Sequence, residues 1–254
     1  MALQTGKTIK ERRSGIDQLP LRIAGLVATF LVGIAYLFPA LSWMDGFKWF
    51  AFPIFAYLIN EGYEKTLDRR LYARRLLLFS ILSEIPHDLF VSGRAVYYDD
   101  QNVLITLLIG YIAIIALDRV REKLENTFVT LLTALALSWI GYNLGKAFGL
   151  EMYTIAIALM LVFNISGHVT YTKLMQFAVL MYFAYRDYSA MLLQPSSELP
   201  FFIPAPVFAL AALILIWLYN GERGVNTMRS RYIFYAVYPV EMLLLWVIRL
   251  IALN

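Results

Sequence analysis

The sequence contains no cysteine and only two histidines, and both scarcities narrow the chemistry open to the protein. Without cysteine there are no disulfides, no thiol nucleophiles and no zinc–thiolate sites. Two histidines cannot supply a three-histidine metal site, so no metal cofactor is expected. Charge is also scarce, since Asp, Glu, Lys and Arg make up 16% of the 254 residues. No phosphate-binding glycine loop, dinucleotide fingerprint or metalloprotease helix is present, which excludes the common soluble cofactor enzymes.

Apolar residues are abundant instead, at 60% of the chain, whereas soluble domains usually hold about 45–50%. They form continuous runs such as Leu104–Leu117 and Val207–Leu218, without the alternation of a membrane barrel. In hydrocarbon, each backbone N–H and C=O must be bonded within its own segment, so runs of roughly 20 apolar residues predict spanning helices. The sequence therefore predicts an all-α polytopic membrane bundle.

Nine spanning helices are predicted, separated by charged clusters or by Gly and Pro. They cover residues 20–41, 47–62, 71–91, 102–118, 127–143, 150–165, 171–190, 202–220 and 232–252. No convincing cleavage site follows the first run, which is therefore interpreted as a retained helix and not a signal peptide. Residues 1–19 are polar and basic and are expected to touch anionic lipid, whereas residues 20–254 form the transmembrane domain.

The 22 Lys and Arg residues divide unevenly between the two sides that nine spans define. Only Lys48, Arg94, Lys146, Arg186 and Arg249 fall on the side where the chain ends, and all the others fall on the opposite side. Because basic loops stay in the cytoplasm, the N-terminus is predicted to be cytoplasmic and the C-terminus extracytoplasmic, in a bacterial inner membrane. The net charge of +4 then reflects topology, so the expected partner is the lipid bilayer and not nucleic acid.

Glu84, His87 and Asp88 are the most conspicuous polar residues in the predicted spans. Their i, i+3, i+4 spacing places all three on one helix face. Ionisable groups at membrane depth are costly unless paired, so each one is a candidate functional residue. A histidine beside carboxylates has its tautomer fixed, as a general base requires. The alternative is a buried polar cluster that locks this helix to Arg94 or to a neighbouring helix.

Glu241 lies about ten residues into the last predicted span, two residues after Pro239. An unpaired carboxylate at this depth would be protonated, or it needs a cation such as Lys48 or an inward-facing Arg. Structural pairing and a functional role both remain open for it.

Several other polar residues have simpler explanations. Asn60 and Glu61 end the second predicted span and are interpreted as a helix end at the interface. Asn102 is placed to cap the fourth span, and His168 follows a glycine in a predicted loop, where solvent would surround it.

Five different stretches along the chain are distinctive: Ala51–Tyr63, Arg74–Leu89, Gln101–Gly110, Leu218–Gly224 and Phe234–Pro239. The first is Ala-Phe-Pro-Ile-Phe-Ala-Tyr-Leu-Ile-Asn-Glu-Gly-Tyr, and the second ends in Ser-Glu-Ile-Pro-His-Asp-Leu. In this order they resemble the TraX family of membrane proteins, which is named for a conjugal-pilin N-acetylase and grouped with the wider membrane acyltransferases. The resemblance spans nearly the whole chain.

This resemblance implies that an acyl or acetyl group passes from acyl-CoA or acetyl-CoA to an amine or hydroxyl. The acceptor would belong to an exported peptide, a pilin-like substrate or an envelope molecule. Acyl transfer needs a base for the acceptor's proton and a cation or hydrogen-bond donor for the developing oxyanion. We expect His87 to be the base and Glu84 and Asp88 to orient it. Lys48 is the expected electrostatic partner, and Glu241 is a further candidate.

The chain departs from the family pattern at expected catalytic positions. Leu31 and Val32 stand where members carry an Asp-His pair, and Trp49 stands where they carry an Arg. Glu241 replaces the His of their last helix, and His87 replaces a Phe. Two alternatives therefore stay open. One is a non-catalytic relative that binds, assembles with or gives immunity to an exported peptide or a second membrane protein; the other is a small transporter coupled through its intramembrane carboxylates.

Overall fold

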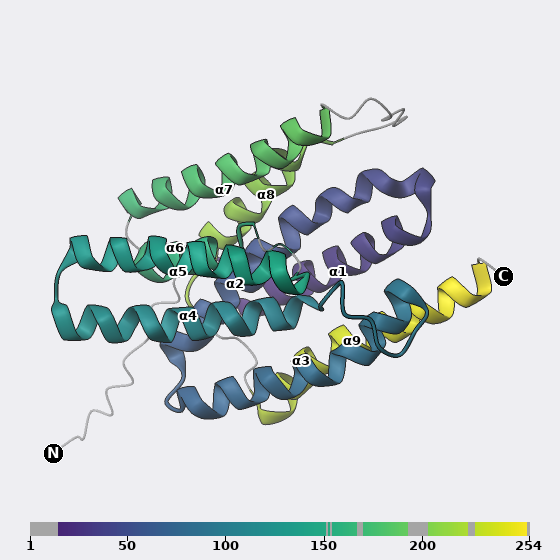
Figure 1. The fold of residues 1–254 in the computed structure, drawn as a ribbon, viewed down its shortest axis with the longest axis horizontal. Helices are drawn as coiled ribbons and strands as arrows, with labels where there is room; N and C mark the ends of the chain where they lie inside the picture. Colours follow the sequence, from purple (N-terminus) through teal and green to yellow (C-terminus); the bar gives the residue numbers. More distant parts are fainter. Residues whose placement is uncertain are drawn as a thin grey trace, which may run out of the picture.

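The computed structural model describes residues 15–150, 152, 154–166, 170–192, 203–222 and 227–252, which fold into a helical bundle (Figure 1). The elements in these ranges are α1 (Gln18–Leu37), the 3₁₀-helix η1 (Pro39–Phe47), α2 (Lys48–Lys65), α3 (Arg69–Ser92), α4 (Val103–Leu124), α5 (Thr127–Phe148), α6 (Ala156–Ser166), α7 (Thr170–Leu192), α8 (Ala205–Trp217) and α9 (Met228–Ala252). Each predicted span corresponds to one α-helix. The basic arm up to residue 14 and the predicted loop residue His168 lie outside the described residues.

Several observed helix boundaries differ from the predicted ones: α4 and α5 continue to Leu124 and Phe148, beyond the predicted ends at 118 and 143, whereas α1, α6 and α8 are shorter than predicted. The predicted span 20–41 was continuous, but α1 ends at Leu37 and η1 begins at Pro39. Proline has no N–H and favours an extended residue before it, and Phe38 has φ −122° and ψ 102°. α6 and α8 are each shorter than the predicted spans 150–165 and 202–220.

Four helices in the described part of the chain are long and apolar enough to cross a membrane. These are α1, α4, α5 and residues 232–252 of α9. α6 and α8 are apolar but shorter, whereas α2, α3 and α7 are long enough and fall outside this group because they are less apolar or more charged. The bundle is therefore of the membrane type, with its most polar long helix, α3, packed among apolar ones.

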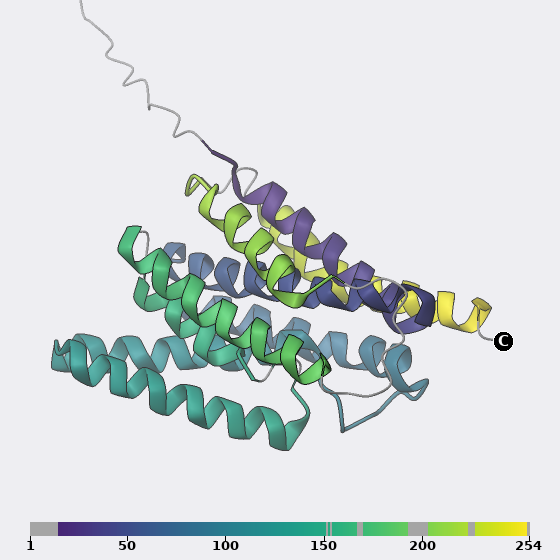
Figure 2. The ribbon, with the colours of Figure 1, turned by 90° about the horizontal axis from the view of Figure 1, so that it is seen from above.

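α2 is the central helix of the bundle and packs against α1, α4, α6 and α8. Buried side chains such as Trp49, Phe52 and Ile54 point from it in several directions, as expected for a helix surrounded by protein. Figure 2 shows α4 and α5 on one side of the bundle and α1, α8 and α9 on the other.

α3 is held mainly by α9 and α4. α3 and α9 begin at the same end of the bundle (Figure 1), which also carries Lys65, Arg69, Arg70, Arg74 and Arg75 and is called the basic end below. Near that end Phe79 stacks on Tyr235, with ring centroids 5.2 Å apart. At the opposite end Arg249 of α9 donates to the carbonyls of Phe90 and Val91, the latter at 2.8 Å.

Replacing Arg249 with alanine is expected to destabilise the protein by about 1–3 kcal/mol, because two carbonyls in the last turn of α3 lose a charged donor. Unfolding in mixed micelles with increasing dodecyl sulfate measures this change. The control is Arg186→Ala, which removes the same charge from an exposed position on α7 and should change stability by less than about 0.5 kcal/mol. Equal losses from both variants would show that Arg249 does not tie α9 to α3.

Candidate functional site

The three polar residues predicted to share a face of α3 lie together near the end opposite the basic end. His87 and Asp88 are buried, with 6% and 2% of their surface exposed, and Glu84 is partly buried. The start of α3 is capped by Asp68, whose side chain accepts from the N–H of Leu71 at 2.8 Å. It continues through Pro86 without interruption to the left-handed residue Gly93, so all three side chains belong to one helix.

Asp88 is fixed by the loop that follows α3. Its Oδ2 accepts a hydrogen bond from the backbone N–H of Tyr97 at 2.8 Å, while Oδ1 has no hydrogen-bond partner among the described residues. The loop is also joined to the α5 terminus, where the N–H of Gln101 donates to the carbonyl of Gly149 at 2.9 Å. These bonds hold residues 97–101 across the end of α3.

Glu84 is fixed by Asn102, which connects α3 to α4. The Asn102 side-chain amide donates to the Glu84 carboxylate and to the carbonyl of Ser80, the latter at 2.9 Å. Its Oδ1 accepts from the N–H of Leu104 at 3.0 Å, which confirms the predicted cap of α4. One fully buried side chain thus caps a helix and orients a carboxylate on its neighbour.

His87 is buried with neither ring nitrogen in a hydrogen bond to the described residues. Nε2 lies 3.9 Å from Oδ2 of Asp100, in the loop. Burial raises the pKa of the Asp100 carboxyl above its ordinary value, and the nearby Asp88 raises it further. A buried imidazole with unengaged nitrogens beside carboxylates is a suitable arrangement for receiving a proton from a bound ligand.

Glu241 of α9 is buried and has a neutral hydrogen-bond partner. Its Oε2 accepts from the Thr29 hydroxyl at 3.2 Å, and Oε1 has no partner in the described ranges. The contacts of Tyr235 and Arg249 with α3 place Glu241 about level with Ser83, whose buried hydroxyl also lacks a partner there. The cation that the sequence suggested for Glu241 is thus replaced by a threonine of α1.

Lys48 has partners on other elements. It pairs with Asp45 of η1 at 2.7 Å and lies 4.0 Å from Asp187 of α7, which also accepts from the Trp49 indole at 2.8 Å. The helix that begins at Lys48 packs against α1, α4, α6 and α8, whereas α3 packs mainly against α4 and α9. These contacts tie Lys48 to η1 and α7. The role expected of Lys48 beside His87 stays a prediction.

Glu61 had been interpreted as a helix end, but α2 continues to Lys65 and Glu61 is 2% exposed. Its carboxylate pairs with Lys65 and accepts from the Tyr219 hydroxyl at 2.5 Å. The i, i+4 spacing of Glu61 and Lys65 is a signal that could have revealed the pair. Nothing in a single sequence points to Tyr219, 158 residues away.

No group of three or more His, Asp or Glu side chains within the described ranges is arranged to hold a metal ion.

A family model described as TraX protein matches residues 26–249. The match includes α2 to α8 and the residues of the α3 cluster. No curated protein and no solved structure matches the chain.

Replacing Asn102 with alanine is expected to cost about 2–4 kcal/mol, because the α4 cap is lost together with the donor to Glu84 and Ser80. Thermal unfolding in detergent measures the effect. Asn143→Ala makes the same change at an exposed position on α5 and should alter stability by less than about 0.5 kcal/mol. A neutral Asn102→Ala variant would mean that Glu84 is not held through this amide.

Proposed function

Because the chain belongs to the TraX family, we propose that it is an acyltransferase of the bacterial inner membrane. The donor is acyl-CoA or acetyl-CoA, and the acceptor is an amine or hydroxyl on an exported peptide or an envelope molecule. The observation that carries this proposal is the state of His87, which is 6% exposed, has no hydrogen-bond partner on either nitrogen, and stands among Glu84, Asp88 and Asp100.

The reaction assigns a task to each of these groups. The imidazole of His87 takes the proton from the acceptor N–H or O–H as the acceptor atom bonds to the thioester carbonyl carbon. The tetrahedral oxyanion collapses, the C–S bond breaks and the CoA thiolate leaves, and the proton held on His87 is released to that thiolate. Asp100, 3.9 Å from Nε2, favours the protonated imidazole while it exists. Asp88 and Glu84 are held by Tyr97 and Asn102 and keep the cluster in place.

The purified protein, incubated with radiolabelled acetyl-CoA and candidate acceptors, should release CoA thiol and label the acceptor. His87→Ala is expected to lower the rate by about 10²-fold or more, because a positioned base typically contributes that much. His168→Ala is the matched control, as it removes the other histidine of the chain from a predicted loop, and it should keep the rate within about twofold. Transfer that His87→Ala leaves unchanged would remove His87 from the reaction.

The second candidate function is a non-catalytic relative that binds an exported peptide or a second membrane protein. The placement of Lys48 favours this candidate. Lys48 is the cation expected to assist acyl transfer, and it pairs instead with Asp45 and Asp187. Co-purification of a stoichiometric second subunit, together with no thiol release for any acceptor, would support this candidate against the enzyme.

The proposed topology has all nine α-helices crossing the bilayer with the basic end in the cytoplasm. Its support is the concentration of Lys65, Arg69, Arg70, Arg74 and Arg75 where α2 ends and α3 begins. The α3 cluster then lies toward the outer surface, on the side from which an exported acceptor would approach.

The absence of cysteine allows a clean test of this topology with single-cysteine variants. Tyr98→Cys, in the exposed loop after α3, should react in intact cells with a membrane-impermeant maleimide. Leu67→Cys, fully exposed between α2 and α3, should react only after the membrane is permeabilised. The reverse pattern of labelling would invert the orientation.

A further inference from the structure

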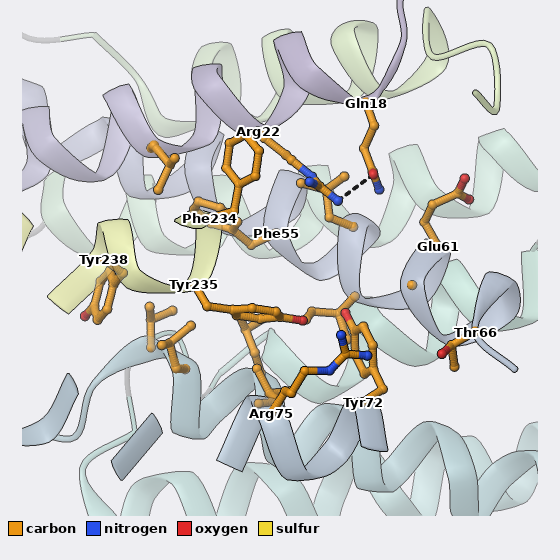
Figure 3. Close-up of a pocket in the computed structure, with 18 residues that line it drawn as sticks. Gln18, Arg22, Phe55, Glu61, Thr66, Tyr72, Arg75, Phe234, Tyr235 and Tyr238 are labelled. Carbon is orange, nitrogen blue, oxygen red and sulfur yellow. Dashed lines mark hydrogen bonds between the residues drawn. The ribbon is translucent and has the colours of Figure 1, made fainter. Parts of the chain in front are cut away.

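A cavity of about 150 Å³ lies toward the basic end, between α1, α2, α3, α4 and α9. None of the five residues predicted from the sequence to form the site lines it. Its polar wall includes Arg22, Arg75, Tyr72 and Tyr235 (Figure 3). Leucine side chains of α2 and α4 also line the cavity and make part of its wall apolar.

Arg75 is the most unusual residue of this cavity. It is 8% exposed, and the centre of its guanidinium lies 5.9 Å from the centroid of the Tyr72 ring (Figure 3). Nε donates to the carbonyl of Leu71 at 3.3 Å, and the other four N–H donors have no acceptor in the part of the chain that the structure describes. Within the same residues no carboxylate lies within 4.0 Å of it. A buried cation in this state is costly unless an anion joins it.

The remaining charges around the cavity leave it positive. Arg22 enters from α1, where it donates to Gln18 at 2.6 Å and lies 4.7 Å from the Phe234 ring centroid. Among the described residues that line the cavity, the one carboxylate is that of Glu61, which is paired with Lys65 and accepts from Tyr219. An incoming anion would therefore meet two guanidiniums and an acidic group whose charge is already compensated.

The apolar wall and the size of the cavity restrict the ligand further. Leu58, Leu104 and Leu107 line the same cavity as the arginines, so the bound group has an apolar part as well as its charge. About 150 Å³ suits a body no larger than benzene, so the cavity encloses part of a larger ligand. A planar guanidinium binds phosphate through a pair of N–H donors. Arg75 has no carboxylate partner among the described residues, so its terminal N–H groups can make this pair.

We propose that this cavity binds the phosphate group of an amphiphile, with Arg75 as its bidentate donor. Under the proposed acyl transfer, on which this assignment of the ligand rests, the phosphate belongs to the CoA part of the donor. A membrane phospholipid headgroup presents the same chemistry. Binding itself is measured without turnover, so its failure is separable from failure of the transferase proposal.

The test uses the full chain in nanodiscs with two probes, CoA and dioleoyl phosphatidic acid. CoA binding is followed by calorimetry in phosphatidylcholine discs, and phosphatidic acid by its enrichment around the protein over phosphatidylcholine. Arg75→Gln should weaken binding of the recognised probe at least tenfold, as expected when a charged donor to phosphate is lost. If Arg75→Gln weakens binding of CoA, the ligand is a soluble phosphate compound. If it weakens binding of phosphatidic acid, the ligand is a lipid. Equal affinity of Arg75→Gln and wild type for both probes overturns the site.

The matched control is Arg74→Gln, which removes the neighbouring charge from an exposed position of the same helix and should change affinity less than about twofold. If Arg75→Gln does not fold, Gly62→Val provides the second variant. A side chain at Gly62 would begin 2.5 Å from the Tyr72 hydroxyl, and both residues line the cavity, so valine there must displace Tyr72 and change the shape of the cavity while leaving the charges unchanged. It should weaken binding several-fold, and normal binding by this variant would also overturn the site.

Discussion

Burial of a polar face along α3 is the constraint on which the rest of the structure depends. From Arg75 through Ser80, Ser83, His87 and Asp88, this helix turns polar side chains into the bundle while leucines and isoleucines on its other side remain exposed. Polar groups without water must find partners inside the protein. The partners come from α4 and its preceding loop, and from α9, whose arginine satisfies the last carbonyls of α3. The packing of α4 and α9 is in this sense set by what α3 buries.

Some buried polar groups on α3 have hydrogen-bond partners within the described residues, and others have none. Asn102 bonds the Ser80 carbonyl, the Glu84 carboxylate and the start of α4 at once. His87, Ser83 and one oxygen each of Asp88 and Glu241 lack hydrogen bonds within the described chain, as do the terminal nitrogens of Arg75. Buried donors and acceptors are usually paired with protein or ordered water, so each unpaired one is a candidate for contact with a ligand or a water. Open donors and acceptors at two levels are what ligands require.

The sequence was sufficient for the parts of this arrangement that depend on local spacing. Nine apolar or amphipathic segments each became a helix, because helical hydrogen bonding is satisfied within the segment. The shared face of Glu84, His87 and Asp88 follows from i, i+3 and i+4 spacing, and the cap at Asn102 from its residue type. Partners distant in the chain were not accessible: Thr29 and Glu241 are 212 residues apart, and no local signal joins them.

Arg75 shows the limit most clearly. As a member of a basic cluster at a helix start, it is indistinguishable from Arg74 in the sequence, and both count equally toward the charge asymmetry that indicates topology. The structure separates them, because one residue of helix rotation carries Arg75 to 8% exposure while Arg74 stays at the surface. Only the packing of α9 and α4 against α3 decides which of the two enters the cavity.

The cavity and the cluster of Glu84, His87 and Asp88 are separate in space, but both include residues of α3. Along α3, Arg75 and Glu84 are about 14 Å apart, at 1.5 Å per residue. The cavity wall includes Val103 and Leu104, and the residue before them, Asn102, bonds Glu84. A donor whose phosphate is held at Arg75 therefore needs a long, narrow and flexible arm to bring an acyl group toward the cluster. The pantetheine thioester of acyl-CoA has this shape, whereas a phospholipid held by its headgroup carries its acyl chains as esters beside the phosphate. The spacing along α3 therefore links the two proposals: if the anion bound at Arg75 is the phosphate of acyl-CoA, the acyl group can extend along α3 toward His87.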